Sequence, residues 1–203
     1  MPSAKPKKRD ITRKRVIDAT VDCIYRDGFN AAHTNKIAEE AGVTWGVLQY
    51  HFGDKDGLLQ ATLDSIFEDF KHTLQAADVD AADLQHRISN FVDVIWTLVS
   101  KKQYRVSTAI LRNAGKDKTS RINGQKQAKL WSAIIGQLWN ELLQGEKINA
   151  ATKETSMRLL FATIRGLHDD VNPHARLSRN SYAAERAALV QAIHYLLTRP
   201  TEQ

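Results

Sequence analysis

The sequence predicts an all-α fold, and three observations support this prediction. Apolar residues recur at spacings of three and four along most of the chain, which is the period of an amphipathic helix. No segment shows the sustained alternation of apolar and polar residues that half-buried strands need. The 203 residues include only 4 prolines and 10 glycines, so few positions interrupt the helices. We expect about nine helices, with short ones near the start and longer ones after them.

Four helices are expected in the N-terminal part, over about residues 11–27, 34–41, 44–51 and 55–70. Gly28 is expected to end the first helix, and Gly42 to form the turn between the two short ones. Asp54 is expected to cap the fourth. Five more helices are expected over about residues 83–101, 104–113, 120–144, 154–171 and 181–198, which predicts a helical bundle.

The net charge of +6 lies entirely in residues 1–15, which hold seven basic side chains and one acidic side chain. The remaining residues hold 22 basic and 22 acidic groups. A basic arm, which we assign to residues 1–9, suits the backbone of nucleic acid, where Lys and Arg displace condensed counterions. The alternative is a tail that only increases solubility.

Several classes of protein are disfavoured by composition. No apolar run approaches the ~20 residues that span a bilayer, and the basic N-terminus lacks the apolar stretch of a signal peptide. Cys23 is the single cysteine, so no internal disulfide is possible. The sequence has no Gly-rich phosphate loop and no convincing Ser-His-Asp set. We therefore expect a cytoplasmic protein that is not an enzyme and needs no cofactor or metal.

The two short helices and the glycine between them form a helix-turn-helix pattern. Ile37, Ala38, Val47 and Leu48 have the spacing of buried anchors. The outward face of the second helix then consists of Thr44, Trp45, Gly46, Gln49, Tyr50 and His51. A helix of two turns is marginal alone, so we expect its neighbours to hold it in place.

This outward face suits a DNA groove. Thr44 and the free amides at the helix N-terminus can bind a phosphate. Gln49 can donate to and accept from an adenine edge, and Trp45 can contact a thymine methyl group or a sugar. Gly46 costs about 1 kcal/mol relative to Ala inside a helix, so it needs a reason, such as close approach to a base.

Less specific interpretations exist for several of these residues. Tyr50 could pack on the first helix, and His51 is more often a packing or capping residue than a ligand contact. Thr34 and Thr44 could be ordinary helix N-caps. The combination of paired short helices, a polar and aromatic face and the basic arm favours DNA binding.

The stretch "HTNKIAEEAGVTWGVLQYHFGDKDGLL", preceded by "DGFNAA", resembles the DNA-binding signature of the TetR family of ligand-responsive transcriptional repressors, over about residues 10–60. The resemblance implies a homodimer on a palindromic operator in double-stranded DNA, with a recognition helix from each subunit in the major groove. It also implies a small-molecule effector bound in the C-terminal body. The DNA contacts expected from the resemblance and from the outward face are Thr34, Lys36, Thr44, Trp45, Gly46, Gln49, Tyr50, His51 and Lys55.

Two residues depart from the family pattern, in which a small residue, Lys or Arg is usual at the position of Trp45, and Tyr is frequent at that of Gln49. Both positions lie where base edges would be read, so no relative supplies the operator sequence.

The expected domains are a DNA-binding domain over residues 10–53 and an effector-binding and dimerisation domain over residues 54–203, joined by a shared helix that reaches about residue 70. In the family the last two helices pair with their copies in a four-helix interface. The expected interface residues are Met157, Leu160, Phe161, Ile164, Leu189, Val190, Ile193 and Leu197. The alternative is that these residues close the core of the single chain.

Aromatic residues gather in the central helices and are candidates for an effector pocket that takes a largely apolar or aromatic molecule. The candidates are Phe91, Trp96, Tyr104, Arg112, Trp131, Trp139, Phe161 and Arg165. The alternative is that the aromatic members of this set form core.

One cluster favours a different function. His168, Asp169, Asp170 and His174 lie within seven residues and bear a faint likeness to a metal-dependent phosphohydrolase. No second cluster of ligands accompanies them, so a metal sensor or enzyme is the minor alternative.

Overall fold

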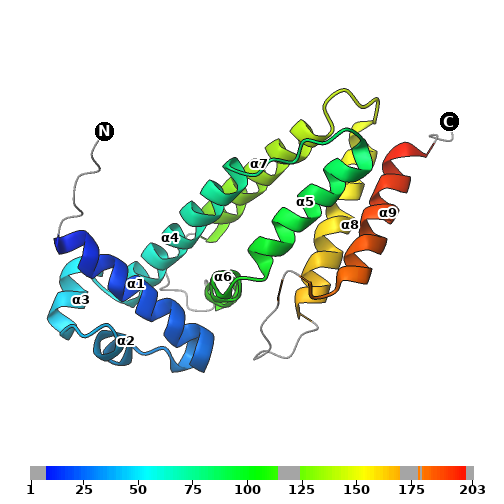
Figure 1. Cartoon of the computed structure of the whole chain (residues 1–203). Helices are drawn as coiled ribbons and strands as arrows, with labels where there is room; N and C mark the ends of the chain where they lie inside the picture. The colour runs from blue at the N-terminus through cyan, green and yellow to red at the C-terminus, as the bar shows by residue number, and fades with distance from the viewer. Residues whose placement is uncertain (1–7, 114–123, 170–177, 179, 200–203) are drawn as a thin grey trace. The chain divides into compact units, whose positions relative to one another are not determined.

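The computed structural model describes residues 8–113, 124–169, 178 and 180–199, and all regular elements among them are helical, which confirms the predicted all-α class. The elements are α1 (Lys8–Asp27), the 3-10 helix η1 (Phe29–Ala31), α2 (Thr34–Glu40), α3 (Trp45–Phe52), α4 (Lys55–Gln75), α5 (Leu84–Val99), α6 (Lys102–Asn113), α7 (Gly124–Leu142), α8 (Ala150–Asp169) and α9 (Ala183–Thr198) (Figure 1).

The chain forms two compact units, each made of two stretches of sequence. Unit 1 comprises residues 1–69 and 102–129, and unit 2 comprises residues 70–101 and 130–203. Helix α6 belongs to unit 1 because it packs against α1 and η1. The boundary expected between residues 53 and 54 therefore lies inside unit 1, and the functional division into two domains stays a prediction.

Unit 1 is built around α1, which contacts α2, η1 and α6. The apolar side of α1 is buried through Val16, Cys23 and Ile24. Gly28, with φ of 84°, ends this helix as expected, because the left-handed region is open to glycine at no steric cost. The helix starts at Lys8, earlier than expected, so basic residues assigned to the arm form its first turn.

Unit 2 places α5 against both α8 and α9, which also contact each other. Figure 1 shows these three helices side by side. The centres of the Phe91 and Trp139 rings are 5.1 Å apart, which joins α5 to α7. Trp96 is fully buried, and its indole N–H donates to the Ser178 carbonyl at 3.0 Å. This contact ties α5 to the segment before α9.

Candidate functional site

Helices α2 and α3 form a helix-turn-helix corner in unit 1. Gly42 takes a φ of 61° between them, which supplies the left-handed turn expected of this glycine. The amide of Val43 then donates to the Ala38 carbonyl at 2.9 Å. Thr44 caps α3, since its hydroxyl accepts a hydrogen bond from the Val47 amide at 3.4 Å. Local contacts of Gly42, Val43 and Thr44 therefore determine the geometry of this corner.

Helix α3 buries little of its own surface. Leu48 is its one buried residue, with 0% exposed. The side chains of Trp45 and Tyr50 are large and exposed, at 43% and 75%. Thr44, Gly46 and Gln49 are exposed as well. The structure thus gathers the expected base-reading residues on the outer face of α3.

His51 and Lys55 are less exposed than Trp45, Gln49 and Tyr50, since both are half-buried. The His51 ring lies edge-on to Tyr50, with ring centres 5.2 Å apart, and its Nδ1 is buried without a hydrogen-bond partner. The Lys55 ammonium lies 5.3 Å from the centre of the Phe29 ring. Both side chains therefore make packing contacts within unit 1.

Thr34 and Lys36 lie on α2. Thr34 is the first helical residue, and His33 occupies the N-cap position without a side-chain hydrogen bond, so the interpretation of Thr34 as an N-cap was wrong. The Lys36 ammonium lies 3.0 Å from an Asp27 carboxylate oxygen. Lys36 therefore already has an ionic partner on α1.

A cluster of charges joins the end of α1 to α2, and sequence patterns did not indicate it. Arg26 pairs with Asp27 at 2.6 Å and also with Glu40. Hydrogen bonds from Arg26 and then Lys36 lower the pKa of Asp27 to about 2. Burial raises the pKa of the neighbouring Cys23 thiol. These contacts hold α2 against α1.

Among the described residues, Cys23, Asp27 and Glu40 are the group whose ligand atoms lie close enough to hold a metal ion, all within 4.8 Å of one another. Both carboxylates already pair with Arg26 or Lys36, so cations of the chain itself occupy this place.

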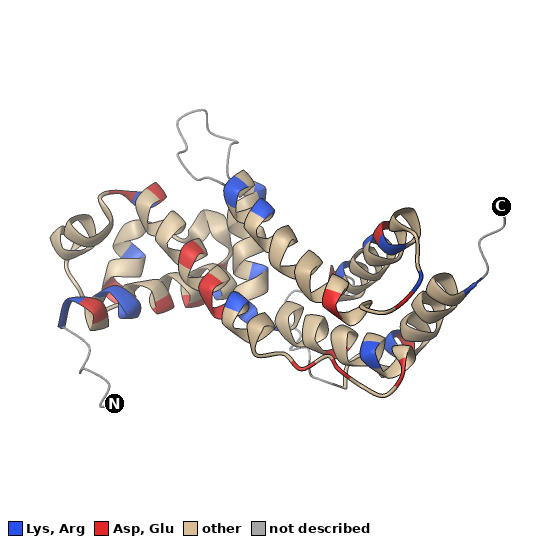
Figure 2. Ribbon diagram, turned by 90° about the horizontal axis from the view of Figure 1, so that it is seen from above, with Lys and Arg blue, Asp and Glu red and all other residues tan. Residues whose placement is uncertain are grey.

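Basic residues line the start of α1, next to the arm (Figure 2). Lys8, Arg9 and Arg15 are exposed there. Lys14 is also exposed but pairs with Asp18 at 2.6 Å. Arg13 differs from all of these because it is half-buried. Lys5 and Lys7 lie outside the described residues.

Gly46 and Gly57 differ in whether packing within the chain requires a glycine. A Cβ atom added at Gly46 would meet only the Thr44 hydroxyl, at 3.9 Å, so packing within the chain does not require a glycine there. A Cβ atom added at Gly57 would lie 2.0 Å from the Phe52 carbonyl oxygen. Gly57 therefore allows the first turn of α4 to pass close to the end of α3, a requirement that the sequence pattern did not reveal.

The residues expected at a dimer interface mostly form the core of unit 2. The buried ones are Leu160, Ile164, Leu189, Val190, Ile193 and Leu197, while Met157 and Phe161 are half-buried. A side chain that is already buried in one chain has no surface left to bury against a second chain. These residues contribute to the core of unit 2, as the alternative interpretation expected, and their assignment to a dimer interface stays a prediction.

Five of the expected pocket residues are aromatic side chains of unit 2. Phe91, Trp96 and Trp139 are buried in unit 2, where the ring of Phe91 also lies edge-on to that of Phe161. The half-buried Trp131 packs against Phe70, with ring centres 5.4 Å apart. The ring of Trp96 packs edge-on against Tyr182, so each of these rings has an aromatic neighbour within unit 2.

Three members of the expected pocket set carry polar or charged groups. Arg165 is exposed and donates to the Phe161 carbonyl of its own helix. Tyr104 and Arg112 belong to α6 in unit 1. An effector pocket lined by this set stays a prediction.

The alternative metal cluster is only partly described. His168 is buried, and its Nδ1 lies 3.0 Å from an Asp169 oxygen. Asp170 and His174 lie outside the described residues. Within the described part of the chain, no helix has both the length and the apolar character needed to cross a membrane.

Comparison with known proteins places the corner in a family. Residues 16–62 match the bacterial regulatory proteins of the tetR family. The HTH-type transcriptional regulator BetI of Burkholderia thailandensis is 34% identical over 91 residues, which cover 42% of this chain and 47% of that protein. The chain thus matches about half the length of this relative.

Two solved structures share the fold over nearly the whole chain. The multidrug binding protein EbrR complexed with ethidium has a TM-score of 0.63 at 18% identity, covering 93% of this chain and 99% of that one. The transcriptional regulator FadR from Bacillus subtilis in complex with stearoyl-CoA has a TM-score of 0.62 at 17% identity, covering 91% and 97%. At these identities the likeness concerns the fold.

The matched residues 16–62 include both helices of the corner and the whole exposed face of α3. This segment is therefore similar to the DNA-binding part of the tetR family of bacterial regulatory proteins.

Proposed function

We propose that the protein is a cytoplasmic transcriptional repressor that binds a palindromic operator as a homodimer and is released by a small, largely apolar or aromatic effector. The observation that carries the proposal is the exposed polar and aromatic face of α3, beside the basic start of α1. Such a face supplies base contacts, and the basic turns supply the charge for phosphate binding.

Thr44 and three residues of α3 make different contacts with DNA. Thr44 and the free amides at the start of α3 bind a phosphate, because helix N-termini attract anions. Gln49 reads an adenine edge, and Trp45 lies one helical turn before it on the same face. The space around Gly46 admits a methyl group, so its glycine serves close approach to DNA rather than packing within the chain.

The same proposal includes phosphate contacts from Thr34, Lys36, Tyr50, His51 and Lys55. Tyr50 is the most exposed of the large apolar side chains and is free to reach outward. The side chains of Lys36 and Lys55 remain partly exposed to solvent. In the free protein the Lys36 ammonium contacts Asp27 and the Lys55 ammonium contacts the Phe29 ring.

A second copy of the chain docks on the outer faces of α8 and α9. Leu159 on α8 and Tyr195 on α9 are large apolar side chains that remain 46% and 66% exposed. Exposed alanines and a glycine flank them, which allows close approach of a partner helix: Ala162, Gly166, Ala188 and Ala192. Pairing two α3 helices is needed because a dimer reads two half-sites one helical turn apart.

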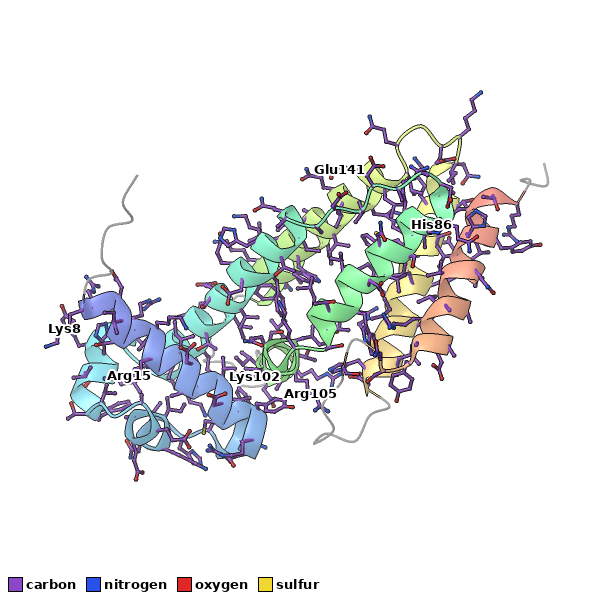
Figure 3. The ribbon with its side chains drawn as sticks, viewed as in Figure 1. Lys8, Arg15, His86, Lys102, Arg105 and Glu141 are labelled. Atoms are coloured by element: carbon purple, nitrogen blue, oxygen red, sulfur yellow. The ribbon has the colours of Figure 1, made fainter. Side chains whose placement is uncertain are left out.

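For an effector to release DNA, the conformational change that it causes must reach α3. Helix α6 is joined to α1 by the ion pair of Lys102 with Asp22, and the Arg105 guanidinium lies 6.0 Å from the Tyr25 ring centre (Figure 3). An effector that prefers a different arrangement of the dimer releases DNA by as much as its affinities for the two states differ. The chemical class of the effector follows the aromatic content of unit 2, and the ethidium complex of EbrR is consistent with it.

Selection of duplex DNA on the purified full-length chain tests the proposal. We expect an enriched palindrome with half-site centres about 10 base pairs apart. The Gln49→Ala variant should select a different base at one position of each half-site, whereas Lys55→Ala should lose affinity on every sequence and lower the salt slope by about one. Failure of the wild-type chain to enrich any sequence would overturn the proposed function.

Light scattering tests the proposed dimer. The wild-type chain should be dimeric, and Leu159→Glu combined with Tyr195→Glu should be monomeric. Leu130→Glu is the matched control, because Leu130 is 50% exposed on α7, away from the proposed surface. A monomeric wild-type protein at micromolar concentration would contradict the assignment.

A further inference from the structure

The C-terminal end of α3 receives a side chain from α1. The Arg13 Nη1 donates a hydrogen bond to the His51 carbonyl at 3.3 Å. Its guanidinium carbon also lies 4.8 Å from the centre of the Phe52 ring. The last carbonyls of a helix have no partner within the helix, and the negative end of the helix dipole attracts a cation. Arg13 satisfies both requirements at once and stacks on an aromatic face.

Backbone contacts also hold this end of α3. Gly53 ends the helix with a φ of 79°, and its amide donates to the Gln49 carbonyl at 2.8 Å. The His51 ring contributes no bond from its buried Nδ1. At the opposite end of α3 the Val47 amide donates to the Thr44 hydroxyl at 3.4 Å. A helix of eight residues with one buried side chain therefore relies on α1 for its orientation.

Arg13 differs in this respect from the basic residues beside it in the sequence. Lys14 pairs with Asp18 on the surface of α1, and Arg15 is exposed. Composition counts all three toward the +6 charge of the N-terminal region. The structure separates them, because the half-buried Arg13 reaches the end of α3 across 38 residues of sequence.

We propose that Arg13 is a positioning residue for α3, which fixes the orientation of the DNA-reading face before DNA arrives. It acts through the His51 carbonyl and the Phe52 ring, and it does not bind phosphate. A face that is already ordered loses less conformational freedom on binding, so removing Arg13 weakens binding even though the residue touches no DNA. This inference rests on the proposed function.

Two measurements on the full-length chain test this role. Arg13→Met removes the guanidinium while keeping a long apolar side chain, and Arg15→Met is the matched control two residues away. Operator affinity is measured by fluorescence anisotropy at several salt concentrations, and amide hydrogen exchange of residues 45–53 is measured on the free protein. Arg13→Met should weaken binding about tenfold, as loss of a hydrogen bond from a charged group does, with the salt slope unchanged. Its α3 amides should exchange faster.

The control should behave in the opposite way. Arg15→Met should lower the salt slope by about one, as loss of a phosphate contact does, and leave exchange in α3 unchanged. The same pattern in Arg13→Met would overturn the inference. If Arg13→Met does not fold, Arg13→Lys replaces it, because lysine keeps the charge but lacks the planar group. The salt slope of Arg13→Lys should equal that of wild type, and its α3 amides should still exchange faster. Unchanged exchange in Arg13→Lys would then overturn the inference.

Hydrogen exchange separates this inference from the proposed function. If the wild-type chain bound no DNA, the proposed function would fail. Faster exchange in α3 of the free Arg13→Met protein would still show that Arg13 positions this helix.

Discussion

Helices α3 and α5 both begin at a side-chain cap, but they are stabilised in different ways. Thr44 caps α3 and Asp83 caps α5, each accepting a bond from an amide three residues on. Helix α5 then buries eight of its residues, among them Phe91 and Trp96, whereas α3 buries only Leu48. Burial holds α5 in its unit, while α3 is held by Arg13 and by the corner with α2. Its remaining surface is thereby left available for DNA.

The largest expected effect is on the side of α5. Phe91→Ala should lower the free energy of unfolding by about 3–5 kcal/mol, because it empties a fully buried site against Trp139. Urea denaturation measures the loss, and hydrogen exchange should locate it in unit 2. A loss below about 1 kcal/mol would show that α5 is not stabilised by its core contacts.

The corresponding truncation in α3 should lower the free energy of unfolding by less, but it should reduce operator binding by more. Leu48→Ala should cost about 2–4 kcal/mol and abolish operator binding, since Leu48 is the one fully buried residue of α3. Val47→Ala, at a half-buried neighbour, is the control and should cost less in both measurements. Equal operator affinity in wild type and Leu48→Ala would refute the view that α3 must be held in order to bind.

A substitution on the exposed face of α3 should separate stability from binding. Gly46→Ala should raise the free energy of unfolding by about 0.5–1 kcal/mol, because Ala is the better helix former and the added methyl has room. Operator affinity should fall in the same variant, because the methyl group keeps the backbone away from DNA. Unchanged affinity with raised stability would remove Gly46 from the DNA contacts.

The two helix caps should respond differently to pH. The His86 amide lowers the pKa of Asp83 below its ordinary 3.8. The stabilisation by this carboxylate is therefore complete above pH 3.8 and is lost as the pH falls through the lower pKa of the folded protein. The Thr44 hydroxyl does not titrate in this range, so its cap should be insensitive to pH.

Melting temperatures of Asp83→Ala and Thr44→Ala, compared with wild type at about pH 5 and about pH 3, measure this difference. The deficit of Asp83→Ala should shrink at the lower pH, and that of Thr44→Ala should stay constant. A constant deficit in both variants would mean that the charge of Asp83 does not contribute to its cap.

The helices and the corner could be predicted because their causes are local. Gly28 and Gly42 take the left-handed backbone that their positions indicated, and Thr44 and Asp54 accept the expected capping bonds. The outward face of α3 followed from the spacing of its buried partner Leu48. Thr34 was the exception, because Ser and Thr occur at the first helical residue as well as at the N-cap.

Long-range contacts could not be predicted in the same way. An apolar stripe such as that of Leu160 and Ile164 has the same pattern whether it faces its own core or a partner chain. The structure shows that α5 and α9 cover this stripe, and it leaves Leu159 and Tyr195 exposed instead. Pairing of Lys36 with Asp27 likewise depends on two helices that only the fold brings together.

By itself, the sequence determined the helical class, the helix-turn-helix corner and the exposed face of α3, since periodicity, caps and glycines act over a few residues. Tertiary structure decided which basic residues at the described start of α1 remain exposed and which one contacts α3. Arg13 and Arg15 are alike in charge and lie two positions apart, yet one is half-buried on the His51 carbonyl and the other is exposed. That distinction arises because the direction of a side chain from α1, and what it meets, depend on where the chain places α3 many residues later.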